Sequence, residues 1–246
     1  MTSRWSPVAA SLVLLAACGR PPGRPAKDAE ALAPSEVVEF RALYATNCAG
    51  CHGRQGRGGA AIGLADPVYL AIVDDASIRK VVGEGVPGTA MPAFAQTAGG
   101  MLTDAQIDAI TSGIRSWQQP AGLEDAPPPR VTTSTGDVHR GREAFGTYCA
   151  SCHGAQGAGG PKGSSITGDS FLALVSDQAL RTVVIAGRAD LGAPDWRGYV
   201  PGRPMSDQEV TDVVAWLASQ RVPSPGQPYT ASADRRYRAA SNDLPR

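Results

Sequence analysis

The sequence has no excess of charge of either sign, and aromatic residues are scarce. Its 246 residues include 23 Lys and Arg against 23 Asp and Glu, and aromatic side chains make up 6% of the chain. Balanced charge without a basic cluster argues against a general polyanion binder and gives no sign of nucleic-acid binding. Motifs for nucleotide binding, metal-dependent hydrolysis or a catalytic triad are also missing, so the common enzyme signatures do not apply.

The chain is also poor in apolar core for its length. It has 29 Gly and 20 Pro, a composition typical of loop-rich structure. The length suits about two small domains, and two units of about 85 residues are marginal on apolar burial alone. Helical spacing recurs in both halves without a competing alternation of apolar and polar residues, so we expect an all-α fold completed by a bound group.

Four of the five cysteines lie in two copies of one motif, Cys-x-x-Cys-His. This motif attaches c-type haem: its two thiols add to the porphyrin, and the histidine ligates the iron. A redox disulfide or half of a zinc site is the alternative, but His follows both pairs directly and no thioredoxin-like strand pattern surrounds them. We predict two covalent haems. The copies are Cys48-Ala49-Gly50-Cys51-His52 and Cys149-Ala150-Ser151-Cys152-His153.

The fifth cysteine, Cys18, ends an apolar run that begins after Arg4. A short basic start, an apolar stretch and small residues before the cut indicate a secretory signal, and the run is too short for a comfortable membrane span. Leu15-Ala16-Ala17-Cys18 resembles the bacterial lipobox, in which the cysteine is lipidated. An ordinary signal peptide with an incidental cysteine is the alternative. We expect export and a lipid anchor at Cys18, on the periplasmic or outer face of a bacterial membrane.

Breaks rich in proline separate two repeats. The tail beyond the second repeat is Pro-rich and then basic, and it could pack across a partner. The expected segments are a lipoprotein-type signal peptide (1–17), a Pro-rich tether (18–35), a first domain (36–120), a linker (121–136), a second domain (137–222) and a tail (223–246).

Each repeat opens and closes with a helical pattern. Phe40 and Tyr44 stand four residues apart before the first haem motif, and Gly141 and Phe145 hold these places in the second. A glycine-rich loop requiring positive φ follows each motif. The closing helices are expected to open with Thr103-Asp104-Ala105-Gln106 and with Ser206-Asp207-Gln208-Glu209, the second of which is a capping box. Their inward stripes are Ile107, Ile110 and Ile114 in the first repeat, and Val210, Val213 and Leu217 in the second.

This order of elements resembles the class I cytochrome c family over most of residues 36–120 and 137–222. The resemblance implies two tandem helical domains, six-coordinate haems with His and Met as axial ligands, and transfer of single electrons. Met91, in Thr89-Ala90-Met91-Pro92, matches the axial methionine, whose weakly donating thioether raises the reduction potential. Met101, directly before the closing helix, is expected to pack.

The second domain departs from this pattern. A gapless comparison of the repeats sets Ala193 opposite Met91, and both residues precede a proline. Met205 lies twelve residues after Ala193, opposite Leu102. Either a rearranged loop brings Met205 to the second iron, or the sixth position is open or filled otherwise. His139 lies ahead of the second haem motif and is expected to be solvated.

Together these features predict electron transfer in a respiratory chain by an exported, membrane-tethered di-haem cytochrome c. Its partners would be a redox donor and a redox acceptor, with a respiratory complex as one candidate. No substrate pocket is implied, so an electron carrier is expected rather than an enzyme. Two alternatives remain: a cytochrome subunit of a larger membrane oxidoreductase complex, or a catalytic or ligand-sensing haem at the second site.

Overall fold

The computed structural model describes residues 32–124, 127–129 and 134–223. Cys18, the signal segment, most of the tether and the tail from residue 224 lie outside these ranges. The chain divides into a short unit, residues 1–36, and a larger unit that starts at residue 37. Of the first unit, the described part contains the 3-10 turn η2 (Pro34–Glu36). The larger unit holds every helix from α2 onward.

The described ranges contain helices and two isolated β-bridges but no strand, which confirms the all-α prediction. None of the helices in these ranges combines the length and the apolar character needed to cross a lipid bilayer.

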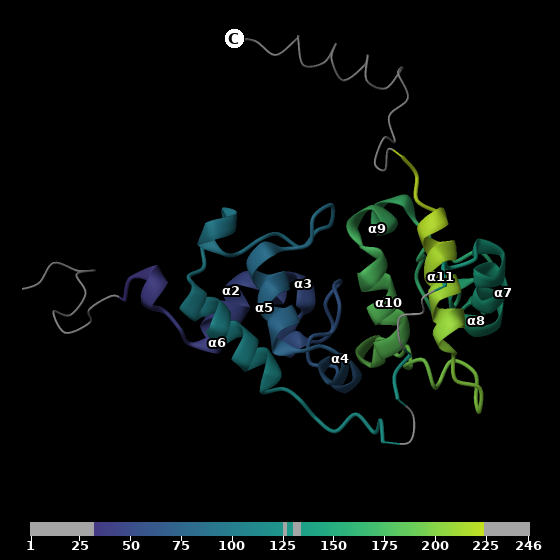
Figure 1. The fold of residues 1–246 in the computed structure, drawn as a ribbon, viewed down its shortest axis with the longest axis horizontal. Coiled ribbons are helices and arrows are strands. Elements are labelled where there is room, and N and C mark those ends of the chain that lie inside the picture. Colours follow the sequence, from purple (N-terminus) through teal and green to yellow (C-terminus); the bar gives the residue numbers. More distant parts are fainter. Residues whose placement is uncertain (1–31, 125–126, 130–133, 224–246) are drawn as a thin grey trace, which may run out of the picture. The chain divides into compact units, whose positions relative to one another are not determined.

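The first lobe is formed by the helices of the first repeat (Figure 1). Glu39 starts its opening helix by accepting hydrogen bonds from the backbone N–H groups of Arg41 and Ala42. Thr103 and Gln106 form a reciprocal capping box at the start of the closing helix. The elements are α2 (Phe40–Asn47), α3 (Ala49–His52), η3 (Arg54–Gly56), α4 (Pro67–Ile72), α5 (Asp75–Glu84), η4 (Gln96–Ala98) and α6 (Asp104–Arg115).

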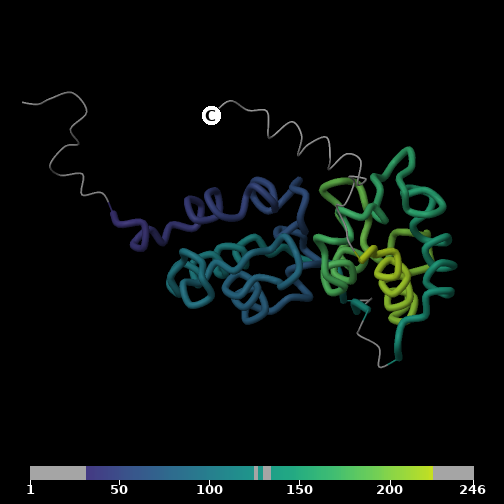
Figure 2. The backbone as a smooth tube through the Cα atoms, turned by 90° about the horizontal axis from the view of Figure 1, so that it is seen from above, coloured from purple at the N-terminus to yellow at the C-terminus, as the bar shows by residue number. Residues whose placement is uncertain are grey.

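Over its described residues, the second lobe has the same order of helices but no counterpart of η3. Figure 2 traces its backbone in green to yellow. Ser206 and Glu209 form the predicted capping box of its closing helix. The opening helix packs against the closing helix in both lobes. The elements are α7 (Val138–Tyr148), α8 (Ala150–His153), α9 (Asp169–Leu174), α10 (Asp177–Ala186), η5 (Ala189–Leu191) and α11 (Asp207–Ser219).

Each lobe has its own cluster of buried apolar side chains. The predicted stripes of α6 and α11 lie in these clusters, and none of their six side chains is more than 3% exposed. Full burial of a side chain of this size contributes about 1.5–3 kcal/mol, so these stripes fix the face that each closing helix turns inward. The stripe residues are Ile107, Ile110 and Ile114 in α6, and Val210, Val213 and Leu217 in α11.

Where the opening and closing helices cross, each lobe has one large residue and one glycine. The large residue is on the opening helix in the first lobe and on the closing helix in the second. In the first lobe the ring of Phe40 on α2 covers Gly113 on α6, where an added Cβ would lie 2.1 Å from Phe40 Cδ2. In the second lobe the glycine is on the opening helix: a Cβ at Gly141 would lie 2.8 Å from Trp216 Cβ on α11. Trp216 also stacks on Phe145, with ring centroids 4.3 Å apart. Both crossings therefore combine one large and one small residue, but on opposite helices.

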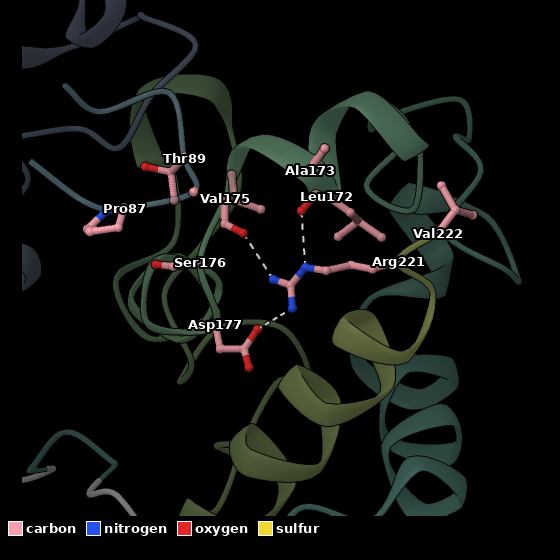
Figure 3. Close-up of a pocket in the computed structure, with 10 residues that line it drawn as sticks. Pro87, Thr89, Leu172, Ala173, Val175, Ser176, Asp177, Arg221 and Val222 are labelled. Atoms are coloured by element: carbon pink, nitrogen blue, oxygen red, sulfur yellow. Dashed lines mark hydrogen bonds and ion pairs between the residues drawn. The ribbon is translucent and has the colours of Figure 1, made fainter. Parts of the chain in front are cut away.

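In each lobe, an arginine near the end of the closing helix binds the segment that joins two other helices, α4 to α5 in the first lobe and α9 to α10 in the second. Arg115 donates to the carbonyl oxygens of Leu70 (2.6 Å) and Val73 (2.7 Å) and pairs with Asp75. These carbonyls lie at the end of α4, where no helical donor reaches them. Figure 3 shows Arg221 making the equivalent contacts in the second lobe, with Leu172, Val175 and Asp177.

Candidate haem-binding sites

Both Cys-x-x-Cys-His motifs form a single helical turn that continues the opening helix of their lobe. The N–H of Cys48 donates to Tyr44 O (2.9 Å), and the N–H of Cys149 donates to Phe145 O (2.9 Å). The motif then winds through α3 in the first lobe and α8 in the second. Residues three apart on a helix share a face, so the two thiols of each motif can reach one edge of the same macrocycle.

The first thiol of each motif lies in an environment that does not favour disulfide exchange. Burial raises the pKa of the Cys48 thiol to about 11 and that of Cys149 to about 12, and in each case the neighbouring thiol of the motif adds to the rise. Reactive dithiols instead have a lowered pKa, which makes the thiolate available at neutral pH. The environment therefore argues against a thioredoxin-like role for these pairs.

The two histidines are held in the orientation that a metal-bound imidazole requires. His52 Nδ1 bonds to the carbonyl oxygen of Ile62 (2.9 Å), and His153 Nδ1 bonds to that of Ser164 (2.8 Å). When Nδ1–H donates to a carbonyl, Nε2 keeps its lone pair for a metal. Burial lowers the pKa of His52, the Ile62 hydrogen bond opposes this, and the charge of Arg188 lowers the pKa further. The residues present thus fit a histidine-ligated haem.

A glycine-rich loop follows each motif and brings the carbonyl oxygen of Ile62 or Ser164 within hydrogen-bonding distance of the histidine. Gly53 has φ +77° and Gly154 has φ +79°, which confirms the predicted requirement for positive φ. A Cβ at Gly53 would lie 1.8 Å from Arg57 O, and one at Gly154 would lie 2.5 Å from Gly159 O. A larger residue at either position would displace the loop that orients the imidazole.

Met91 lies in a loop rather than on a helical stripe. Its carbonyl oxygen accepts from the N–H of Val86 (3.0 Å), and its N–H donates to the Thr89 hydroxyl (3.2 Å). Gly85, with φ +67°, lets the chain pass close by, since a Cβ there would lie 2.8 Å from Met91 O. The side chain is half-buried, and it stays the predicted axial ligand of the first site.

The second lobe has the same loop geometry with alanine at the methionine position. The N–H of Arg188 donates to Ala193 O (2.9 Å). Gly187 has φ +71°, and its Cβ would lie 2.8 Å from Ala193 O. These contacts match those of Gly85 and Met91, so Ala193 holds the place of Met91.

Met205 lies in the core of the second lobe, 3% exposed. It directly precedes the N-cap Ser206, and its N–H donates to Trp196 O (3.0 Å). Leu102 precedes the N-cap of α6 in the same way and is also buried. This placement favours a role for Met205 in core packing, and its ligation of the second iron stays a prediction.

Two expectations for other residues have different outcomes. His139 is exposed, in agreement with its predicted solvation. The expectation that Met101 packs is wrong, because its side chain is 80% exposed. The chain turns at Gly99, which has φ +86°, and Leu102 rather than Met101 then enters the core.

Tyr199 was not identified from the sequence. It packs partly buried against the second core, and its hydroxyl donates to Val184 O (3.0 Å). Burial raises the pKa of Tyr199, and the charges of Cys149 and Asp195 add to the rise. Tyr199 and Cys149 of the second haem motif pack against the same core. The sequence signal for Tyr199 was its place as one of two aromatic residues, with Trp196, between Ala193 and Met205.

Comparisons with known proteins agree with this arrangement. The profile of the family described as cytochrome C oxidase, cbb3-type, subunit III matches residues 35–112 and 136–217. The Cbb3-type cytochrome c oxidase subunit CcoP of Azospirillum sp. is 34% identical over 131 residues, which is 48% of this chain and 40% of the relative. The cytochrome bc1 complex cytochrome c subunit of Mycobacterium bovis is 25% identical over 178 residues, 71% of this chain and 60% of the relative.

The chain thus spans about half the length of these curated relatives. Among solved structures, the Kuenenia stuttgartiensis reducing HAO-like protein complex Kustc0457/Kustc0458 has 18% sequence identity and a TM-score of 0.44. The match covers 77% of this chain and 99% of that one.

Proposed function

The chain belongs to the cytochrome c oxidase, cbb3-type, subunit III family, and from this premise we propose that it is an exported di-haem cytochrome c transferring single electrons between redox proteins. The observation that carries the proposal is the pair of equivalent Cys-x-x-Cys-His turns, each with its histidine held through Nδ1 by a backbone carbonyl. A covalently bound c-type haem supplies one-electron chemistry at each site.

The chain's own residues hold and tune these groups. Cys48 and Cys51 would attach the first haem, and His52 and Met91 would be its iron ligands. A thioether such as that of Met91 donates weakly, so it would favour the reduced state and raise the potential of this site. Cys149, Cys152 and His153 would play the corresponding roles in the second lobe.

Mass spectrometry of protein matured in its host tests the number of haems. The expected mass exceeds that of the processed chain by two haem groups. Cys149→Ser with Cys152→Ser should remove one addition and leave the other. A native mass with one addition or none would contradict the di-haem proposal.

At the second haem, the sixth iron position would be filled by Met205, open to an external ligand, or filled by another group. The core position of Met205 and the presence of Ala193 at the methionine place support the open form. A ligand-sensing or catalytic role for this site is therefore the second candidate function. Carbon monoxide binding to one of two haems in the unmodified reduced protein would support it. Two haems that both exclude carbon monoxide would argue for plain electron transfer.

We propose that the redox partner is a respiratory complex. Support comes from the relatives, which are named as subunits of a cbb3-type cytochrome c oxidase and of a cytochrome bc1 complex. Blue-native electrophoresis of gently solubilised host membranes tests whether the chain is a subunit or a separate carrier. Migration of its haem stain with a large complex would favour a subunit, and migration alone would favour a tethered carrier.

We also propose that Cys18 is the lipid anchor, because Leu-Ala-Ala-Cys ends the export signal. Cys18→Ser should move the protein from the membrane fraction to the soluble periplasmic fraction. Retention on the membrane after this change would point to a partner or another anchor. Treatment of the membranes with a lipoprotein lipase tests the same anchor independently, because removal of the acyl chains should release the protein.

A further inference from the structure

One loop of the second lobe carries two charged residues that its counterpart in the first lobe lacks. Arg188 and Asp190 lie between Gly187 and Ala193, on the loop that corresponds to the Met91 loop. In the first repeat Val86 and Gly88 hold these positions. The two charged side chains are 11% and 12% exposed and form an ion pair, with Arg188 Nε 3.0 Å from Asp190 Oδ1. Charges buried to this extent need defined partners.

The partners belong to the first haem motif's loop. The N–H of Gly58 donates to Asp190 Oδ2 (2.6 Å), and Arg188 donates to the carbonyl oxygen of Gly59 (2.7 Å). The Arg188 guanidinium, followed by the Gly58 N–H, holds the pKa of Asp190 below its usual range despite burial. Asp190 therefore meets this loop as a carboxylate, next to the guanidinium of Arg188.

The contacted loop lies directly on the haem-attachment turn. A Cβ at Gly59 would lie 2.2 Å from Cys51 O and 2.5 Å from the carbonyl carbon of His52. Only glycine can approach the motif this closely. Gly59 therefore lies between Arg188, which binds its carbonyl oxygen, and the backbone of Cys51 and His52.

We propose that Arg188 and Asp190 form a charged clamp by which the second lobe holds the first haem loop, and that each of the two charges, taken singly, biases the reduction potential of the first site. The proposal rests on the proposed function, since it requires a haem at His52. The oxidised state of a haem carries one more positive charge than the reduced state. A nearby cation therefore favours reduction and a nearby anion favours oxidation, more strongly in a partly buried site than in water. In the intact pair these two effects largely cancel.

The test is a spectroscopic redox titration of the full-length holoprotein that resolves both haems. Arg188→Gln leaves the anion uncompensated and should lower the midpoint potential of the first haem. Asp190→Asn leaves the cation and should raise it. The double variant removes both charges and should return the potential close to its native value. A change that merely loosened the loop would shift both single variants in the same direction.

Arg203→Gln is the matched control. It removes the same charge from the second lobe, where Arg203 is half-exposed and pairs with Glu209, and it should leave the first haem unchanged. Arg188→Lys keeps the charge and supplies a second readout if the neutral variant folds poorly. Its potential should stay closer to the native value than that of Arg188→Gln. Shifts of equal sign, or no shift in variants that carry both haems, would overturn the clamp. A missing first haem in the native protein would instead contradict the proposed function.

Discussion

Gly141→Ala should destabilise the second lobe, because α7 and α11 touch at this glycine. The added Cβ would lie 2.0 Å from Asp212 O and 2.6 Å from Asp212 C. These are backbone atoms, so no rotamer change of a side chain can relieve the contact and the helices must separate. Overpacking of this kind costs about 3 kcal/mol, and the better helix propensity of alanine offsets about 1 kcal/mol of that.

The net loss is therefore about 2 kcal/mol, which lowers the melting temperature of a domain of this size by roughly 8–16 °C. Thermal unfolding of the holoprotein, followed by far-ultraviolet circular dichroism and by haem absorption, measures this change. Gly146→Ala is the control on the same helix, since a Cβ at Gly146 has no neighbour within 4 Å. Its melting temperature should stay the same or rise. Equal behaviour of the two variants would refute the reasoning about the crossing.

Three further predictions concern the iron ligands and the acid limit of stability. Met91→Ala should abolish the methionine–iron absorption band of the first haem and lower its potential, and an unchanged spectrum would remove Met91 from the site. Met205→Ala should lower the stability of the second lobe by about 2–5 kcal/mol through a cavity if Met205 packs; newly acquired carbon monoxide binding would show that it is a ligand. Burial acts to raise the pKa of Asp212, but hydrogen bonds from Arg140 and from the Asp137 N–H lower it overall. Its stabilisation is present above the ordinary carboxyl pKa of 3.8 and is lost as the pH falls through the folded value, so Asp212→Asn should show a weaker loss of melting temperature with acid than the native protein.

The sequence predicted those features that depend on local spacing. The stripe from Ile107 to Ile114 follows helical periodicity, and the haem-attachment turn is contained in five consecutive residues. Ala193 could be set opposite Met91 because no insertion interrupts the repeat up to that point. The structure bears out this register through the matching contacts of Gly85 and Gly187.

Features that depend on turn geometry or on distant contacts were missed. The positive φ of Gly99 decides which neighbouring side chain enters the core, and the pattern around Met101 does not reveal it. Arg188 and Asp190 meet partners about 130 residues earlier in the chain, which no local pattern encodes. Two charged positions one residue apart in a loop ordinarily indicate solvent exposure, whereas here both side chains are largely covered.

The exchange of large and small residues at the helix crossings bears on how a duplicated chain avoids assembling incorrectly. During folding, the opening helix of one repeat could pair with the closing helix of the other, since both repeats offer similar apolar faces. Pairing α2 with α11 would bring Phe40 and Trp216 to the same crossing and overfill it. Pairing α7 with α6 would bring Gly141 against Gly113 and leave a void. A steric clash destabilises the first mismatch and a cavity the second, so the sizes of these four residues favour pairing of each helix with the partner in its own repeat.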